Sequence, residues 1–256
     1  MTARKIRIAR RFGAAHDRYD THADLQRMAA TRLAARVRAL PLPSHPRVLE
    51  IGCGTGGLTR QLAPAIGGDW LVTDLATPMV VACQRQCVNA GIAAHFAVMD
   101  GEHPDLPAAS FDLVVSSLAA QWFEDLPAAL ARLAGLLAPG GHIALVTLGS
   151  ESFREWRAAH AGLGLAPATP VYPDAARLRD SFPPELAVTV AEETLSEPFT
   201  APLEFLRRLR LIGADTPAAN TRPLSAGQLR RVLKALAAQG ETSVTYHLLY
   251  AEAKRR

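Results

Sequence analysis

Three acidic residues and a cluster of glycines have the types and spacing to bind a polar small molecule. The string EIGCGTGG, residues 50–57, follows a short apolar run and precedes a helical pattern. Glycines let a backbone approach a ligand closely, and the N–H groups at a helix N-terminus attract polar or anionic groups. Asp74 and Asp100 each end a further apolar run, so their carboxylates can accept hydrogen bonds from hydroxyl or amino groups. Together these residues predict a site for a nucleotide-like cofactor.

The glycine string satisfies two motifs at once. Gly52, Gly54 and Gly57 fit GxGxxG, the dinucleotide-binding fingerprint. Glu50, followed by Gly52, Gly54 and Gly56, fits the acidic-x-Gly-x-Gly-x-Gly loop that is typical of S-adenosylmethionine enzymes. The glycines alone therefore do not separate a dehydrogenase from a methyltransferase.

The carboxylates favour the second motif. Glu50 stands directly before the glycines, where it would repel a pyrophosphate and attract a cationic methionyl ammonium. Asp74, twenty residues after Gly54, would accept both ribose hydroxyls of either cofactor, and Asp100 is placed to accept from an adenine amino group. The C-terminal part is too short for the separate substrate domain of a typical dehydrogenase. We therefore predict methyl transfer from S-adenosylmethionine rather than hydride transfer.

The elements that must position these residues alternate between strands and helices. Short apolar runs closed by turn residues predict strands, and apolar spacing of three and four residues predicts helices. The five strands expected in the first part of the chain cover residues 47–54, 70–75, 94–100, 111–119 and 142–148. Such alternation with short connections is typical of an α/β fold with a parallel, doubly wound sheet and right-handed crossovers.

The pattern changes after residue 149. Two helices, an edge strand, two basic amphipathic helices and a last strand are expected, in this order, at residues 152–164, 174–182, 186–199, 202–214, 225–240 and 243–255. We therefore predict a helical segment at 1–43, a cofactor-binding core at 44–150, and a C-terminal part with lid helices and the last two strands at 151–256.

Composition excludes several classes of protein. The chain has 256 residues, is 49% hydrophobic and has near-average glycine and proline content, which suits a globular protein and excludes a fibrous one. No apolar run reaches the roughly 18–20 residues of a membrane span, and the basic start lacks the apolar stretch of a secretory signal. Three cysteines without metal-ligand spacing predict a cytoplasmic location, no metal, and core positions for Cys83 and Cys87.

Charge is distributed unevenly along the chain. Residues 1–40 hold ten Lys and Arg against three Asp and Glu, and residues 201–256 hold ten against four. The middle, residues 41–200, holds eight against seventeen, so both ends are basic and the centre is acidic. Basic ends can be ordinary solvated surfaces, or they can attract an acidic partner such as nucleic acid, a membrane surface or an acidic protein.

The chain also resembles a known family. The blocks VLEIGCGTGGLTRQL, VTDLATPMV, MDGEHPDLP, FDLVVSSLAAQW and LLAPGGHIAL, within residues 47–148, are similar to class I S-adenosylmethionine methyltransferases. The flanking segments RRFGAAHDRYDTHADLQ, FLRRLRLIGADTPA and TYHLLYAEAKR resemble the malonyl-acyl-carrier-protein O-methyltransferases that start biotin synthesis. This resemblance implies a Rossmann-like sheet of seven strands, an N-terminal helical segment over the cofactor, and a helical lid inserted before the last strand.

The resemblance also implies roles for individual residues. Tyr19 would contact the methyl end of the cofactor, although an aromatic ring packed on the core explains it equally well. Arg207 and Arg210 are three positions apart and share a helix face, where one of them would grip a substrate carboxylate; a solvated basic stripe is the alternative. The full set expected at the cofactor is Tyr19, Glu50, Gly52, Gly54, Gly56, Asp74, Leu75, Met79, Asp100, Gly101, Glu102, Ser116 and Gln121.

The implied reaction is methylation of the free carboxylate of malonyl-acyl carrier protein, with S-adenosylmethionine as cofactor. A carboxylate is already ionised at neutral pH, so no general base is required. The expected partner is the acidic carrier protein, with no nucleic acid and no membrane. A tRNA, rRNA or other small-molecule methyltransferase is the main alternative, and a non-catalytic protein that kept the fold is another. Carrier-bound and coenzyme A thioesters are not separated by the sequence.

Overall fold

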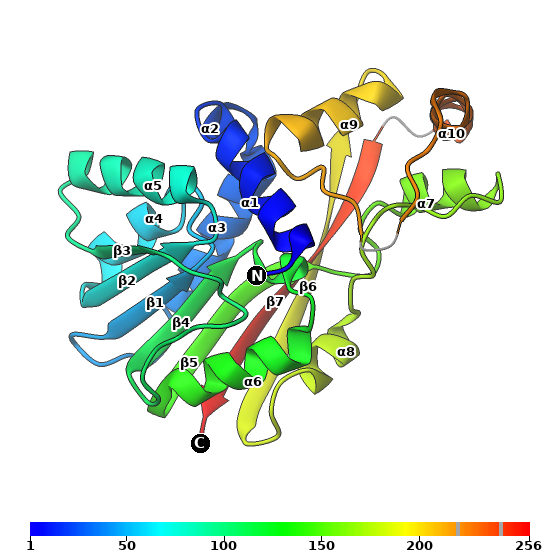
Figure 1. Cartoon of the computed structure of the whole chain (residues 1–256). Helices are drawn as coiled ribbons and strands as arrows, with labels where there is room; N and C mark the ends of the chain where they lie inside the picture. Colours follow the sequence, from blue (N-terminus) through cyan, green and yellow to red (C-terminus); the bar gives the residue numbers. More distant parts are fainter. Residues whose placement is uncertain (219–220, 241–242) are drawn as a thin grey trace.

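A mixed sheet of seven strands forms the centre of the molecule (Figure 1). The computed structural model describes residues 1–218, 221–240 and 243–256. The strand order is β3-β2-β1-β4-β5-β7-β6, which confirms the predicted α/β fold and its seven-stranded sheet. The strands are β1 (Arg47–Ile51), β2 (Asp69–Asp74), β3 (His95–Val98), β4 (Phe111–Ser117), β5 (Leu137–Leu148), β6 (Leu186–Pro198) and β7 (Ser243–Arg255).

Strand direction determines where the candidate site lies. Strands β1 to β5 are parallel to one another, whereas β7 runs antiparallel to both β5 and β6. In the register of the central strands, Glu50 lies between Val72 of β2 and Val115 of β4. The parallel strands therefore bring the ends of β1, β2 and β4 to one edge of the sheet, which is where open α/β sheets bind ligands.

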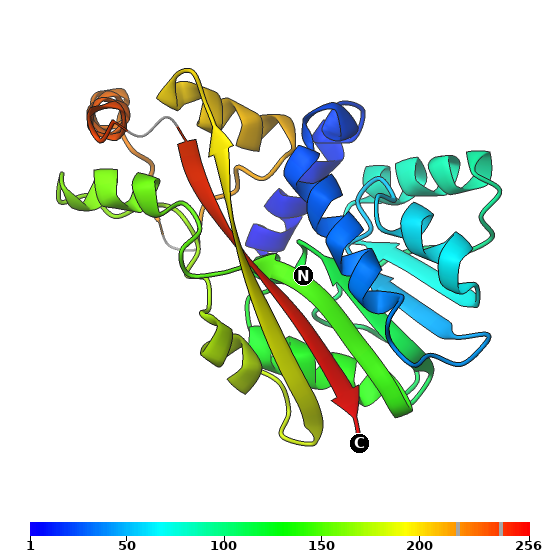
Figure 2. The same ribbon diagram turned by 180° about the vertical axis from the view of Figure 1, so that it is seen from behind.

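Helices cover both faces of the sheet, as the view from behind shows (Figure 2). They are α1 (Ala3–Ala15), α2 (Tyr19–His22), α3 (Asp24–Val37), α4 (Thr59–Ile66), α5 (Thr77–Asn89), a 3-10 turn η1 (Ala120–Trp122), α6 (Leu126–Leu136), α7 (Arg154–Ala161), α8 (Ala175–Asp180), α9 (Pro202–Leu211) and α10 (Ala226–Ala238). Within the described ranges, none of them is long and apolar enough to cross a membrane.

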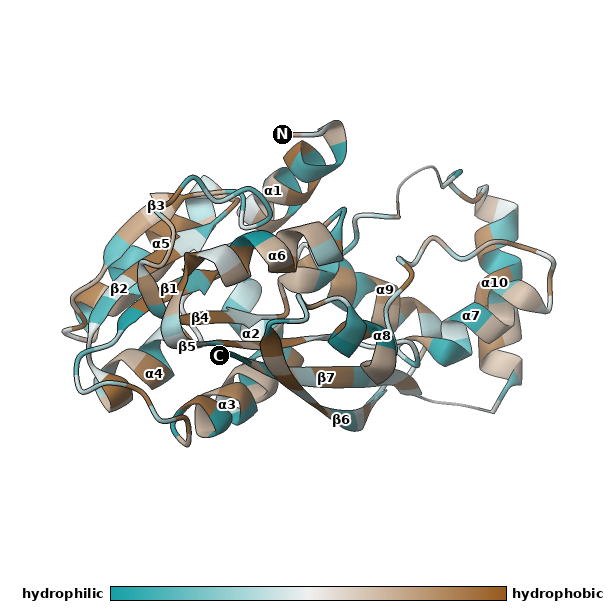
Figure 3. Cartoon of the chain, turned by 90° about the horizontal axis from the view of Figure 1, so that it is seen from below, coloured by the Kyte–Doolittle hydropathy of each residue, from teal (hydrophilic) through white to brown (hydrophobic). Residues whose placement is uncertain are grey.

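Two apolar cores form, one on each face of the sheet. Helices α3, α4 and α5 pack on one face, and Cys83 and Cys87 of α5 lie fully buried there as free thiols, as predicted. Helices α6 and α8 pack on the other face through residues such as Leu133 and Leu178. Seen from below, brown apolar strands lie between α3 and α4 on one side and α6 and α8 on the other (Figure 3).

The segments that surround the candidate site come from both ends of the chain. The predicted N-terminal helical region consists of α1, α2 and α3, and α1 begins at the cap Thr2, whose hydroxyl accepts from Lys5 N at 3.3 Å. The lid helices α9 and α10 lie between β6 and β7 in the chain. Helix α10 begins with a capping box in which Ser225 and Gln228 each satisfy the other's backbone N–H. The domain boundaries at 43 and 150 stay predictions.

Candidate active site

The glycine loop after β1 is tightly packed from both sides. Gly52 and Gly56 have φ angles of +73° and +90°, which L side chains rarely adopt. A Cβ at Gly52 would lie 2.3 Å from the Cβ of Ala119, and a Cβ at Gly56 would lie 2.9 Å from Sγ of Cys83. Gly52 N donates to the carbonyl of Thr73 at 2.8 Å, which ties the loop to β2. Gly52 and Gly56 are therefore required by the packing of the loop itself.

Asp74, the last residue of β2, holds the loop in place. Its Oδ2 accepts from Gly54 N at 3.0 Å, and its Oδ1 accepts from Ala76 N at 2.8 Å. Burial raises the pKa of this carboxyl, while the two backbone donors act in the opposite direction. Each oxygen keeps acceptor capacity for a further donor, such as a diol.

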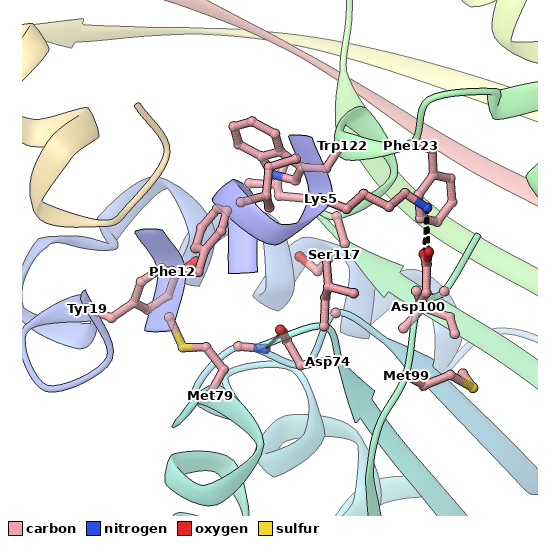
Figure 4. Close-up of a pocket in the computed structure, with 18 residues that line it drawn as sticks. Lys5, Phe12, Tyr19, Asp74, Met79, Met99, Asp100, Ser117, Trp122 and Phe123 are labelled. Atoms are coloured by element: carbon pink, nitrogen blue, oxygen red, sulfur yellow. Dashed lines mark hydrogen bonds and ion pairs between the residues drawn. The ribbon is translucent and has the colours of Figure 1, made fainter. Parts of the chain in front are cut away.

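A cavity opens above the glycine loop and Asp74 (Figure 4). Its walls come from the ends of β1, β2 and β4, from the segment after β3, and from α1 and α2. Of the expected cofactor residues it is lined by Tyr19, Gly52, Gly54, Asp74, Leu75, Met79, Asp100 and Gly101. Other residues that line it include Lys5, Ile8, Phe12, Met99, Ser117, Leu118 and Trp122.

Five of the expected cofactor residues lie outside this lining: Glu50, Gly56, Glu102, Ser116 and Gln121. Glu50 is buried beneath the loop, where its Oε2 accepts from the hydroxyl of Thr59 at 2.7 Å. Burial raises the pKa of Glu50 to about 8, and the Thr59 hydroxyl partly opposes this shift. Its carboxyl is thus mostly neutral at pH 7.

The other four have local reasons for their positions. Gly56 faces Cys83, and Ser116 donates to the carbonyl of Ile51 at 3.0 Å inside the sheet, so that its neighbour Ser117 lines the cavity instead. Glu102 accepts from the backbone N–H groups of Glu124 and Asp125, at 2.9 and 2.7 Å. Gln121 donates to the carbonyl of Leu118 and lines a second cavity, described below.

Lys5 is a site residue that the sequence analysis missed. It is 3% exposed, and its Nζ lies 2.7 Å from both oxygens of Asp100 (Figure 4). The same Nζ lies 2.6 Å from Oε2 of Glu102. This ammonium helps to hold the pKa of Glu102 below its ordinary value, against the effect of burial. Lys5, Ile8 and Phe12 share one face of α1, since they follow the three- and four-residue helical spacing, and this face roofs the cavity.

The second cavity adjoins the first and is larger, with a volume of about 520 Å³. The two cavities share Phe12, Tyr19, Leu118 and Trp122 as wall residues. The rings of Phe12 and Trp122 meet edge to face with centroids 5.5 Å apart. Most of the remaining wall is apolar or aromatic, and α9 forms one side of it.

Tyr19 stands where the two cavities meet. Its hydroxyl is desolvated and lies near the carboxylates of Asp74 and Asp20, and both effects raise its pKa well above the ordinary value. The phenol is therefore neutral at physiological pH and available as a hydrogen-bond donor.

The arginines of α9 point in different directions. Arg207 and Arg210 line the second cavity. Arg208 lies outside that lining and instead donates to Glu197 at 2.9 Å and to Glu204 at 2.6 Å. Arg210 is mostly exposed and lies 3.5 Å from Asp215, and Arg207 has no ion pair within the part of the chain that the structure describes. As the helical spacing predicted, Arg207 and Arg210 thus share one side of α9, and Arg208 lies on another.

Comparison with known proteins agrees with this geometry. A family model described as a methyltransferase domain matches residues 48–141. The YcgJ protein of Bacillus subtilis has a similar structure, with a TM-score of 0.64 and 16% identity over 88% of this chain and 98% of that chain. This structural likeness supports the fold alone.

Two curated relatives match nearly the whole chain. The biotin biosynthesis bifunctional protein BioCD of Bordetella avium is 48% identical over 96% of this chain, which spans 51% of that protein's length. The malonyl-[acyl-carrier protein] O-methyltransferase of Magnetococcus marinus is 44% identical over 96% of this chain and 92% of its own length. The chain therefore belongs to the malonyl-[acyl-carrier protein] O-methyltransferase family.

Proposed function

We propose that this protein transfers a methyl group from S-adenosylmethionine to the free carboxylate of malonyl-acyl carrier protein, in a cytoplasmic route to biotin. The observation that carries the proposal is the pair of adjoining cavities, one beside Asp74 and one beside Arg207, with Tyr19 at their junction. Membership of the family and the names of the relatives supply the substrate.

The residues of the first cavity suit S-adenosylmethionine. Asp74 is fixed by two backbone donors and would accept the ribose hydroxyls. Asp100 would accept from the adenine amino group, while Lys5 stays bound to Glu102. Met79, Leu75 and Gly101 would contact the ribose and adenine. When bound, S-adenosylmethionine supplies an electrophilic methyl group on a sulfonium.

The residues of the second cavity suit an anionic acyl group. Arg207 would pair with the malonyl carboxylate, with Arg210 as a second contact, because a guanidinium binds a carboxylate with two parallel hydrogen bonds. The apolar walls would exclude water from the carboxylate, and Tyr19 would hold the acceptor oxygen in line with the methyl group. No proton has to be removed from an ionised carboxylate, so these residues position and desolvate the acceptor without acting as bases.

The reaction also changes the fit of the acceptor to its site. Methylation converts the carboxylate into a neutral ester, and the ester loses its charge-assisted contact with arginine. The arginines that bind the carboxylate would therefore bind the ester product more weakly, which favours product release.

Mass spectrometry tests the proposed function directly. Malonyl-acyl carrier protein is incubated with the enzyme and S-adenosylmethionine, and a gain of one methylene unit on the malonyl group is expected. Unloaded carrier protein and acetyl-carrier protein are the controls, and both should stay unchanged. Malonyl-coenzyme A and bulk tRNA are tested in parallel as acceptors. Labelling of RNA without labelling of the malonyl group would overturn the proposal.

A further inference from the structure

The loop that follows α9 places two unpartnered polar atoms in the second cavity's wall. Asp215 and Thr216 both line this cavity. Oδ1 of Asp215 and Oγ1 of Thr216 are buried, and neither has a hydrogen-bond partner in the described ranges. Thr216 as a whole is only 4% exposed. Buried polar groups nearly always have a partner, so this pair needs an explanation.

The other oxygen of Asp215 is already in use. Nη1 of Arg11, from α1, and Nε of Arg210, from α9, each lie 3.5 Å from Oδ2. These two guanidinium groups contact the carboxylate from the N-terminal helix α1 and from the lid helix α9. Oδ1 is consequently the oxygen left for a ligand.

The two free atoms have complementary chemistry. The hydroxyl of Thr216 can donate to a carbonyl oxygen, and Oδ1 of Asp215 can accept from an N–H group. A secondary amide carries both groups, whereas a carboxylate such as the malonyl group would be repelled by Asp215. Leaving such atoms unpaired in a buried place is unfavourable, and a ligand with both groups would satisfy both atoms.

We propose that Asp215 and Thr216 form a subsite for a secondary amide of the arm that carries the acyl thioester. This inference rests on the proposed function, because the prosthetic arm of an acyl carrier protein contains such amides between the carrier and the thioester. Arg207 takes the charged end of the substrate, and the loop after α9 takes the amide, so the thioester lies between them along the apolar wall.

The test compares thioesters with and without an amide. Malonyl-N-acetylcysteamine carries one amide, and S-butyl malonyl thioester has a similar length without it. Thr216→Val, which removes the hydroxyl at nearly constant volume, is expected to raise KM for the first about tenfold and to leave kcat and the KM of the second unchanged. Thr216→Ser should restore the wild-type KM. Thr189→Val, on the exposed strand β6, is the matched control and should change neither.

A direct binding measurement separates this inference from the proposed function. Calorimetry with free pantetheine, in the presence of S-adenosylhomocysteine, should show about tenfold weaker binding to Thr216→Val than to wild type or Thr216→Ser. This result is independent of which acceptor is methylated. Equal affinity of all three proteins for pantetheine, or an equal rise of KM for both thioesters, would mean that the two atoms are satisfied by water alone and would overturn the subsite.

Discussion

The ammonium of Lys5 lies 2.7 Å from both carboxylate oxygens of Asp100, a residue 95 positions away in the sequence. The same ammonium contacts Glu102 at 2.6 Å. This contact attaches α1 to the segment after β3, and thus attaches the roof of the first cavity to its floor.

Loss of this contact should weaken both the fold and the cofactor site. We expect Lys5→Met to lower the free energy of unfolding by roughly 3–5 kcal/mol, because the buried carboxylate of Glu102 and the partly buried one of Asp100 lose their counter-charge. Affinity for S-adenosylhomocysteine should fall as well, since α1 no longer closes the cavity. Urea unfolding and calorimetry measure the two effects. Arg7→Met, on the exposed side of the same helix, is the control; similar values for both variants would contradict the role of Lys5.

Removal of the Asp74 carboxylate should act on the cofactor. Asp74→Ala is expected to weaken S-adenosylhomocysteine binding by roughly 2–3 kcal/mol, because two hydrogen bonds to a charged acceptor are lost. Calorimetry on the purified variant measures this loss. Asp69→Ala, at the opposite end of β2, should bind as wild type does. Unchanged affinity of the Asp74 variant, with its fold intact, would remove Asp74 from the site.

The arginines of α9 should differ in their effect on catalysis. Arg207→Ala is expected to lower kcat/KM for malonyl-carrier protein at least about tenfold, equal to about 1.4 kcal/mol, because the substrate carboxylate loses a partner. Arg208→Ala should have a much smaller effect, since its guanidinium pairs with Glu197 and Glu204 outside the cavity. Steady-state kinetics decide between them, and equal losses for the two variants would contradict the assignment.

The buried carboxyl of Glu50 should make stability depend on pH. Its pKa is raised from 4.5 to about 8 in the folded protein, so the folded state holds a proton that the unfolded state releases. The stabilising contribution is present below pH 4.5 and is lost, at about 1.4 kcal/mol per pH unit, as pH rises towards 8. Glu50→Gln should lack this slope. Urea unfolding of both proteins across this range measures it, and parallel curves would refute the prediction.

The basic surfaces of the two chain ends should act on carrier binding. Arg10 and Arg11 on α1 and Arg230 and Arg231 on α10 are all exposed. Raising ionic strength to physiological values, where the screening length is about 8 Å, should raise KM for malonyl-carrier protein much more than KM for a small malonyl thioester. Charge reversal of Arg230 and Arg231 should mimic salt. A KM for the carrier substrate that is flat in both experiments would identify these surfaces as merely solvated.

The sequence predicted those parts of the fold that depend on local patterns. Alternating apolar runs and turn residues predicted the sheet. The apolar run that ends at Asp74 predicted a strand with this carboxylate at its end, as β2 has. The pairing of Lys5 could not be predicted in this way, because α1 is rich in basic residues and only tertiary packing buries one of them. The helical spacing of Lys5, Ile8 and Phe12 was the available signal.

The surroundings of Glu50 and Asp215 could not be predicted either, because both depend on contacts that form only in the folded chain. The motif predicted Glu50 beside a ligand. The hydroxyl of Thr59, nine positions later at the first residue of α4, instead donates to this carboxyl beneath the loop. Asp215 gave no signal in the sequence, because an acidic residue after a basic helix is ordinary. Its role depends on Arg11, which folding brings from the other end of the chain to pair with Oδ2 and which leaves Oδ1 without a partner among the described residues.

The antiparallel position of β7 has a consequence for the order of folding. The part of the first cavity that comes from β1 to β4 is built from consecutive strand–helix units, which can form as the chain is made. Strand β6 pairs only with β7 in the described structure, and the connection between Pro198 and Ser243 contains both lid helices. Leu148 of β5 must also find Leu248 across one hundred residues. Because such distant pairing is slow, a folding intermediate that has the first cavity but lacks the second should precede the native protein.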